Sequence, residues 1–516
     1  MIIPRLDIRD EIYKWLALAT ILIGAFASVL NMTSTNIALP KMMAAFSVGA
    51  TDAQWIITAY TLTLGVLQPV SGYLCDRFGA RRIYLFSLIL FNIGSGLCGT
   101  AWSNESMITF RVIQAMGGGF VIPSSMYIVF SEFAPQERNM ALGIWGLSLS
   151  LAPAAGPTLG GYLADYWNWS YIYFINVPIG ILGLIVATIV LRETKTTKSS
   201  PFDFPGFLCS SIGIFCLLLA LSKGVDDGWD APYIIALFYT AFATLTLFVI
   251  REMTVADPLL DLSLFRDRNF VFGNLVSIMV QFLLMGSMYL IPLFLQRMMG
   301  YSAMDSGIFL LPSAAASLVM SPLAGKLAGK FGEKPMLIAG FLLSIWWTSQ
   351  LVSIDADTDV MLIVWMQTLR GASIGLASMT ATVLSMKNIA GHKIGRANAI
   401  INTLRQIAGS FAVTVMATVM QQRQLFHQEH IAEHVNYASI AFHKLLAQKT
   451  QQFMHSSTGV ELSHRKAIAF LYNVAQKQSA YFSYDDAFFV LEIFAIIGFI
   501  AALLIKSRKV TKNALL

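Results

Sequence analysis

The segment Gly72–Arg82 reads GYLCDRFGARR, and a second copy of it, Gly325–Lys334, reads GKLAGKFGEK. The two copies lie 253 positions apart. A second match, at an offset of 256, relates Arg111-Val-Ile-Gln114 to Gln367-Thr-Leu-Arg370, with Arg and Gln exchanged. Because both matches share nearly one offset, a duplication explains them better than chance recurrence of short Gly/Lys turns. We therefore predict two matching six-helix halves, with two extra helices near 205–251 between them.

The composition excludes a water-soluble fold. Of the 516 residues, 56% are hydrophobic and 12% are charged, and the mean hydropathy is +0.64, whereas soluble proteins carry about 25% charged residues. A spanning helix needs about 20 apolar residues. The fourteen apolar segments lie near 14–38, 50–72, 83–101, 106–130, 139–162, 171–191, 205–222, 233–251, 270–294, 304–325, 335–353, 359–384, 396–420 and 486–505. They predict an all-α integral membrane protein, and duplicated halves are typical of secondary transporters.

The boundaries and the orientation follow from these segments. We predict a cytoplasmic N-terminus at 1–13, an N-terminal six-helix half at 14–191, a linker with two extra transmembrane helices at 192–269, a C-terminal six-helix half at 270–505 that includes an outer loop at 421–485, and a cytoplasmic tail at 506–516. Most of the 35 Lys and Arg residues fall in short loops on the side of the N-terminus. This bias places both termini in the cytoplasm of a multi-pass inner-membrane protein. The net charge of +6 then reflects orientation and is no evidence for nucleic-acid binding.

Enzyme chemistry is not indicated. No nucleophile, metal-ligand set or phosphate-binding glycine loop appears, which also argues against ATP-driven pumping. The outer loop 421–485 holds six of the seven histidines, and His427, His430 and His434 share one helix face. Neither cysteines nor clustered acids support a metal site there, so we interpret the loop as one or two amphipathic outer helices.

Further stretches make the chain recognisable. They are Gln54–Tyr60, the Gly72–Arg82 segment, Arg111–Gln114, Ala152–Gly161, Trp169–Pro178, Asp257–Arg266 and Asn402–Gln406. Over nearly its whole length the chain resembles the fourteen-helix drug:proton antiporters of the major facilitator superfamily, most closely the EmrB-type multidrug efflux pumps. The resemblance implies the major facilitator fold and export of lipophilic small molecules, driven by the proton gradient without a cofactor. It also implies a periplasmic membrane-fusion adaptor and an outer-membrane channel as partners, if the host has two membranes.

The Gly72–Arg82 segment is a candidate gating loop. Gly72 and Gly79 allow a tight turn and close helix approach. Asp76 lies at a helix end, where it can pair with arginines or with the N-terminus of a neighbouring helix. Such a pairing would hold the two halves together on the cytoplasmic side. The alternative is that Arg77, Arg81 and Arg82 only set the topology, and both roles can hold together.

The fifth segment is a candidate antiporter helix. Ala152, Gly156 and Gly160 place a small residue at every fourth position on one face, which permits close packing in lipid. Pro153 and Pro157 remove backbone donors and are expected to kink or loosen the segment. In the resembled family this pattern marks exporters. Close packing alone is the alternative.

Membrane-buried charge gives the proton-coupling candidates. Arg111, Arg370 and Arg405 lie inside predicted spans, where charge is costly and usually faces the bundle interior or a water-filled pathway. Arg111 and Gln114 are three residues apart and so share a helix face. The resemblance implies that Arg111 takes part in proton coupling, while a purely structural arginine is the alternative.

One departure from the family pattern concerns the first helix. Asn31 stands where the resembled family carries an acid, and an amide does not titrate. The proton path is therefore absent or relocated. Glu492, in the last span, is the clearest remaining intramembrane carboxylate, although it is also consistent with a solvated acid at a misjudged helix end.

The same charge balance suggests the substrate. Three arginines and one glutamate lie well inside the spans, which disfavours an unpaired organic cation. The candidate substrate-cavity residues are Trp55, Tyr60, Tyr289, Gln367, Arg370 and Arg405. We predict an exporter of neutral or acidic hydrophobic compounds. The alternatives are a dedicated metabolite or siderophore exporter of the same fold and a sensor or assembly subunit that no longer transports.

Overall fold

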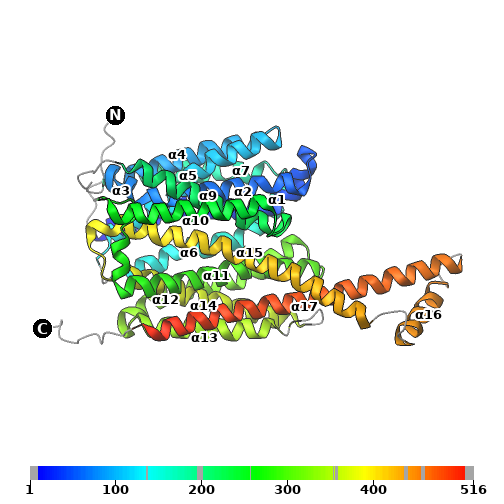
Figure 1. The fold of residues 1–516 in the computed structure, drawn as a ribbon. Helices are drawn as coiled ribbons and strands as arrows, with labels where there is room; N and C mark the ends of the chain where they lie inside the picture. The colour runs from blue at the N-terminus through cyan, green and yellow to red at the C-terminus, as the bar shows by residue number, and fades with distance from the viewer. Residues whose placement is uncertain are drawn as a thin grey trace.

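The protein is described by a computed structural model that covers residues 10–134, 137–193, 202–255, 257–352, 354, 358–434, 440–454 and 459–505. Over these residues it is built of helices and their connections (Figure 1). The α-helices are α1 Asp10–Phe46, α2 Ala50–Leu67, α3 Ser71–Phe78, α4 Ala80–Gly99, α5 Asn104–Glu132, α6 Arg138–Tyr166, α7 Tyr171–Phe174, α8 Asn176–Val190, α9 Phe204–Asp227, α10 Pro232–Thr254, α11 Arg268–Arg297, α12 Ala303–Phe331, α13 Glu333–Leu351, α14 Val360–Met386, α15 Ile394–His434, α16 Ile440–Met454 and α17 Val460–Leu504. Three 3₁₀ turns connect some of them: η1 Gln68–Val70, η2 Leu262–Arg266 and η3 Gly391–Lys393.

The all-α prediction is confirmed. Each of the fourteen apolar segments coincides with helix, and eleven helices of the described residues are long and apolar enough to cross a membrane. The second segment differs from the predicted single helix, since α2 ends at Leu67 and a 3₁₀ turn leads into α3. Pro69 explains the break, because its ring and its missing N–H group do not fit an α-helix interior.

The two duplicated segments form the same kind of turn. Gly79 separates α3 from α4 with a φ of 88°, and Gly332 separates α12 from α13 with a φ of 90°. A residue with a Cβ atom is strained at such angles. The repeat seen in the sequence therefore corresponds to a repeated helix–glycine–helix corner, and the tight turn expected at Gly79 is present.

The helices run roughly along one direction, so the bundle has two ends (Figure 1). We call the end that carries α3 the α3 end and the opposite one the α16 end. At the α16 end, α15 and α17 continue past the bundle and α16 packs on α17. The segment 421–485 is thus mainly a continuation of two spanning helices rather than a separate outer layer. Asp486 of α17 joins them at the base, accepting from Arg423 Nε at 2.6 Å and lying 2.7 Å from His427 Nε2.

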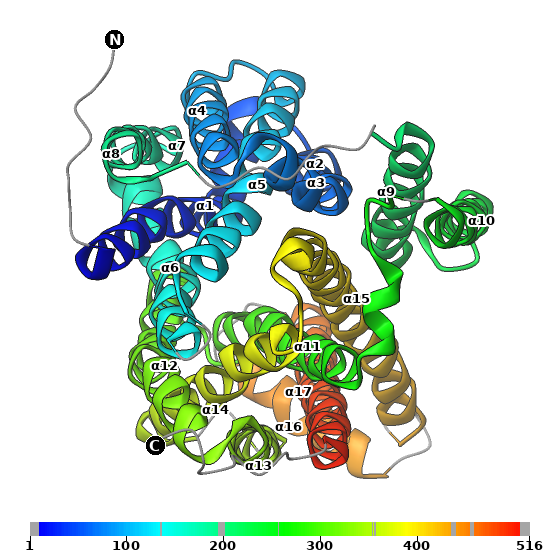
Figure 2. The ribbon, with the colours of Figure 1, turned by 90° about the vertical axis from the view of Figure 1, so that its left-hand side faces the viewer.

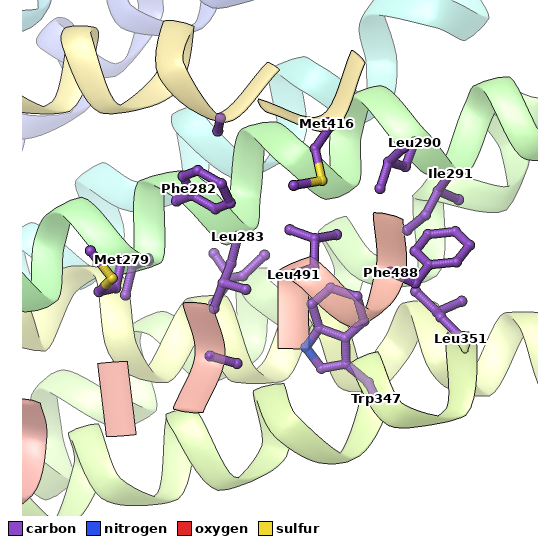
Figure 3. Close-up of a cluster of buried hydrophobic side chains, with 14 of the residues drawn as sticks. Met279, Phe282, Leu283, Leu290, Ile291, Trp347, Leu351, Met416, Phe488 and Leu491 are labelled. Atoms are coloured by element: carbon purple, nitrogen blue, oxygen red, sulfur yellow. The ribbon is translucent and has the colours of Figure 1, made fainter. Parts of the chain in front are cut away.

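The extra hairpin α9–α10 packs beside the boundary between the two duplicated sets of helices, which we call the seam. Helices α9 and α10 pack on each other, and α9 also contacts α2 and α15 (Figure 2). Helix α6 packs along α12, which joins the two duplicated sets of helices on another side. A large apolar cluster lies among α11, α13, α14 and α17, with Phe282, Trp347 and Leu491 at its centre (Figure 3).

Candidate functional site

The first candidate centre surrounds Arg111 of α5, whose side chain is 1% exposed. Its Nη1 donates to Asn31 Oδ1 of α1 at 2.6 Å and to Gln114 Oε1 at 2.7 Å, and its Nε donates to the Ile56 carbonyl at 3.2 Å. All three of these acceptors are neutral. The positive charge of Arg111 is therefore held by amide and carbonyl dipoles rather than by a carboxylate.

Aromatic rings and further polar groups complete this centre. The guanidinium lies 4.0 Å from the ring centroid of Tyr60, a cation–π distance. Gln114 Nε2 donates to Ser95 Oγ at 2.7 Å, which fixes the amide. Two buried groups, Asn31 Nδ2 and the Tyr60 hydroxyl, have no hydrogen-bond partner among the described residues. An uncompensated cation with spare donors beside it is suited to interact with an acceptor or an anion.

A second centre repeats the first in the other half of the bundle. Arg370 of α14 donates from Nε to Ser287 Oγ of α11 at 2.8 Å and from Nη1 to Gln367 Oε1 at 3.2 Å. Ser287 lies 256 positions after Asn31, the same offset that relates Arg111 to Gln367. The structure thus shows two related buried arginines, each bonded to a neighbouring Gln and to a polar residue of the first helix of its set. Ser287 was missed from the sequence, although the common offset pointed to it.

The remaining substrate-cavity candidates lie apart from one another. Arg405 donates to Ser277 Oγ at 2.7 Å and to Thr382, so it bridges α15, α11 and α14. Trp55 faces α9, where Lys223 Nζ lies 5.3 Å from its ring centroid. Tyr289 is partly buried against the cluster of Figure 3. Only Tyr60 with Arg111, and Gln367 with Arg370, are brought together.

Lys223 is a buried cation that sequence reasoning missed. It is 6% exposed, and the predicted span 205–222 ended one residue before it. Helix α9 continues to Asp227, so Lys223 lies within this helix and on its buried face.

A small cavity lies within the described residues. Its volume is about 10 Å³, close to one water molecule. It lies inside the C-terminal set of helices, lined by Trp347, Leu351, Phe488 and other apolar side chains that Figure 3 shows converging, with Gln367 at its wall. Gln367 Nε2 is buried and has no hydrogen-bond partner among the residues that the structure describes. This cavity is too small to hold a drug-sized substrate.

Glu492 lies on α17, partly buried at the border between the helix face that packs inward and the face that carries exposed Phe489 and Ile496. Helix α17 packs against α11, α13, α15 and α16. The structure therefore does not bring Glu492 into the Arg111 centre.

The gating-loop residues meet α15 at the α3 end. A Cβ atom on Gly72 would collide with the Gly395 carbonyl group, and one on Gly395 would lie 2.7 Å from Asp76 Oδ1. Asp76 also accepts from the Tyr127 hydroxyl at 3.0 Å. The carboxylate thus lies against the first turn of α15, where the helix dipole favours negative charge. The second half has Gly329 in place of the acid, with open space around it.

The arginines of this loop have other partners. Arg77 donates to the Tyr73 hydroxyl. Arg81 donates to the Thr188 carbonyl at 2.9 Å and lies 3.6 Å from Glu193. The close approach of Asp76 to Gly395 agrees with the pairing to a helix N-terminus.

The candidate antiporter helix is α6, and its glycine face packs on α1. Ser34 Oγ donates to the Gly156 carbonyl at 3.1 Å, and a Cβ atom on Gly156 would overlap Thr33 Oγ1. A Cβ atom on Gly160 would lie 3.0 Å from Ser34 Cβ. Contacts with α12 are made by another glycine, Gly143, whose Cβ position is 2.8 Å from Pro322. The side chains of Pro153 and Pro157 lie outside the described residues.

Comparisons with known proteins identify a family model and several transporters that this chain resembles. A family model described as Major Facilitator Superfamily matches residues 21–413. The uncharacterised MFS-type transporter YhcA of Bacillus subtilis (strain 168) is 31% identical over 96% of this chain and 93% of its own length. The fatty acid resistance protein FarB of Neisseria gonorrhoeae is 31% identical over 85% of this chain and 87% of its own. The multidrug export protein EmrB of Haemophilus influenzae is 30% identical over 94% and 93%, respectively.

A solved structure shows the same fold. The crystal structure of the human organic anion transporter MFSD10 (TETRAN) superimposes with a TM-score of 0.58, covering 93% of this chain and 99% of that one. At 14% sequence identity, this likeness concerns the fold alone.

Proposed function

This chain belongs to the major facilitator superfamily, and from that premise we propose that it is a secondary active exporter of hydrophobic small molecules, coupled to proton entry. The relatives that match it nearly end to end include proteins named for multidrug export and fatty acid resistance. The observation that carries the proposal is the pair of buried arginine centres, Arg111 and Arg370, placed symmetrically in the two helix sets. Buried charge of this kind is expensive in a membrane and is characteristic of a transport pathway.

The proposed substrates are neutral or acidic hydrophobic compounds. Arg111 and Arg370 are bonded to neutral groups, so an organic cation would meet positive potential at both. A carboxylate would instead find cationic and donor groups. The name of FarB, a fatty acid resistance protein, supports the same substrate class for this chain.

The proposed proton carrier is Glu492. Asn31 occupies the place next to Arg111 where a titrating acid is expected from the family, and its amide cannot carry a proton. Arg111 then provides a fixed positive charge, Gln114 orients the guanidinium by its hydrogen bond, and Glu492 provides the carboxylate. A metabolite or siderophore exporter remains the second candidate, and a non-transporting sensor is the third, since Asn31 is the feature that favours loss of coupling.

The gate and the surroundings complete the proposal. Asp76 against α15 closes the α3 end, which we assign to the cytoplasm together with both termini, in the inner membrane. In a host with two membranes, a periplasmic membrane-fusion adaptor and an outer-membrane channel would meet the α16 end.

Proton release in inverted membrane vesicles tests the function. Vesicles that contain the chain are loaded with a pH dye, a proton gradient is formed, and a hydrophobic weak acid or a neutral drug is added. We expect substrate-dependent proton release that vanishes in the Arg111→Gln variant. Substrate binding without proton movement in any compound class would favour the sensor, and release with a single metabolite would favour the dedicated exporter.

A further inference from the structure

The segment between α10 and α11 carries a motif that the transport pathway does not use. Residues 257–266 read DPLLDLSLFR, and they connect the extra hairpin α9–α10 to α11. We call this segment the strap. Its leucines Leu259, Leu260 and Leu264 are buried and belong to the large apolar cluster that also holds Cys75 of α3 and Ile394 of α15. The strap is therefore part of the apolar core at the α3 end.

Two ion pairs fix the strap to the start of α15. Asp261 Oδ2 lies 2.7 Å from Lys393 Nζ, and Asp257 Oδ1 lies 3.6 Å from Arg396 Nη2. Lys393 Nζ also lies 3.2 Å from Ser263 Oγ. Burial would raise the pKa of the Asp261 carboxyl, but the hydrogen bonds from Lys393 and Ser263 outweigh burial and hold the pKa below its usual value. The carboxylate is thus charged, and one-third-exposed Lys393 is its cationic partner.

The residues bound by the strap flank the contact that closes the gate. Lys393 and Arg396 enclose Gly395 in the sequence, and Gly395 packs against the Asp76 carboxylate and Gly72. One turn further on, Asn398 Nδ2 donates to the Pro123 carbonyl of α5 at 2.7 Å. The first turn of α15 is therefore in contact with α3, α5 and the strap.

The other end of the strap is tied to the hairpin. Glu252 of α10 accepts from the Leu260 backbone N–H at 3.0 Å. The preceding residue, Arg251, donates to Asp203 at 3.1 Å, and Asp203 caps the first turn of α9 by accepting from Gly206 N. A continuous set of polar contacts thus runs from the hairpin through the strap to α15.

We propose that Asp261 and Lys393 are positioning residues of the gate, and that the strap presses the start of α15 onto α3 so that the α3 end closes. This inference rests on the gate in the proposed function and adds a role for the extra hairpin. Without the strap, the first turn of α15 would be held by α3 and α5 alone, and the gate would open more often.

Cys75 provides a reporter inside the gate. It is 2% exposed and precedes Asp76, so a maleimide reaches it only when the packing around α3 opens. The background variant carries alanine at Cys98, Cys209 and Cys216, the other cysteines, and is first shown to retain export. N-ethylmaleimide labelling of Cys75 is then followed in native membranes.

Charge removal is the test of the pair. Asp261→Asn keeps an oxygen that accepts from Ser263 N, as Asp261 does, and removes only the charge; Lys393→Gln removes its partner. Each is expected to raise the Cys75 labelling rate about tenfold, the range for a charge-assisted hydrogen bond. The double variant is expected to be labelled no faster than either single one, because the two residues act as one unit. Lys393→Arg keeps the charge and is expected to label like the background.

The outcomes separate the strap from the gate. Gly72→Ala forces α3 away from α15 directly, and it is expected to raise labelling whatever the strap does. Unchanged labelling in Asp261→Asn and Lys393→Gln, or fully multiplicative effects in the double variant, overturns the inference. If Gly72→Ala still raises labelling in that case, the gate stands without the strap; if it does not, the gate role of Asp76 falls as well.

Discussion

At the scale of single residues, the buried Arg111 is bonded to the amide of Asn31 at a position where the family pattern carries an acid. The 2.6 Å bond from Arg111 Nη1 to Asn31 Oδ1 reproduces the geometry of an ion pair without the second charge. An ion pair can be broken by protonating the acid, but an amide offers no such step. The Arg111 centre therefore offers no carboxyl group to a proton, and the proposed coupling needs a carboxyl group elsewhere.

The first residue-scale prediction concerns Glu492. If this carboxyl carries the proton, Glu492→Gln abolishes substrate-driven proton movement while leaving the amount of folded protein near that of the parent, because Glu492 is only partly buried. The measurement is dye fluorescence in inverted vesicles at matched protein levels. Undiminished proton movement in Glu492→Gln would exclude this carboxyl as the carrier.

Asn31→Asp is the companion variant. An aspartate fits the Asn31 site and gains an ion pair with Arg111, so it is expected to be tolerated and to extend the substrate range toward cations. In Glu492→Gln, added Asn31→Asp is expected to restore part of the proton movement. A double variant as inactive as Glu492→Gln would show that the Arg111 centre does not support coupling even with an acid.

At the scale of elements, close glycine contacts set how α6 lies on α1. Gly156→Ala places a methyl group onto Thr33 Oγ1, and such overpacking costs about 1–3 kcal/mol. We expect a lower unfolding temperature of the purified protein and reduced export. Gly96→Ala of α4 is the matched control, because its Cβ position has open space around it. Equal stability of the two variants would mean that α6 is not closely packed on α1.

The elements themselves could largely be predicted from the sequence, since length and apolarity identify spanning helices. The break at Pro69 also follows from a local rule, yet the apolar pattern of 50–72 hid it. Contacts between helices are different. The spacing of Arg111 and Gln114 fixes one shared face, but which residue of α1 meets that face depends on how α1 is rotated, and this is decided by packing over the whole bundle.

The same reasoning explains the glycine face of α6. The pattern at Ala152, Gly156 and Gly160 predicts close packing but does not reveal the partner, and the partner is α1 of the same set of helices. Contacts across the seam use Gly143, which lies on the same helix nearer its start. Likewise, no local feature of the strap motif shows that it binds α15, because its partners lie about 130 residues away in the chain.

At the scale of the whole molecule, charge is distributed unevenly along the helices. The α3 end carries ion pairs such as Asp261 with Lys393 and Asp203 with Arg251. Deeper in the bundle, Arg111, Arg370 and Arg405 are bonded to amides, hydroxyls and a carbonyl, and Glu492 lies apart from them on α17. We therefore expect a net positive potential along the proposed substrate pathway.

This potential predicts which compounds the exporter protects against. In a medium of low dielectric constant an unpaired organic cation is repelled by buried arginines, while a hydrophobic carboxylate is attracted. Cells that express the chain are expected to gain resistance, about fourfold or more in inhibitory concentration, to fatty acids and uncoupler-like weak acids, and little to ethidium-like dyes. Arg370→Gln should reduce the protection against acids more than that against neutral drugs, whereas Arg465→Gln, which changes an exposed arginine of α17 outside the gating loop, serves as the matched control. Protection against cationic dyes but not against weak acids would show that the arginines are neutralised during transport and that the charge argument is wrong.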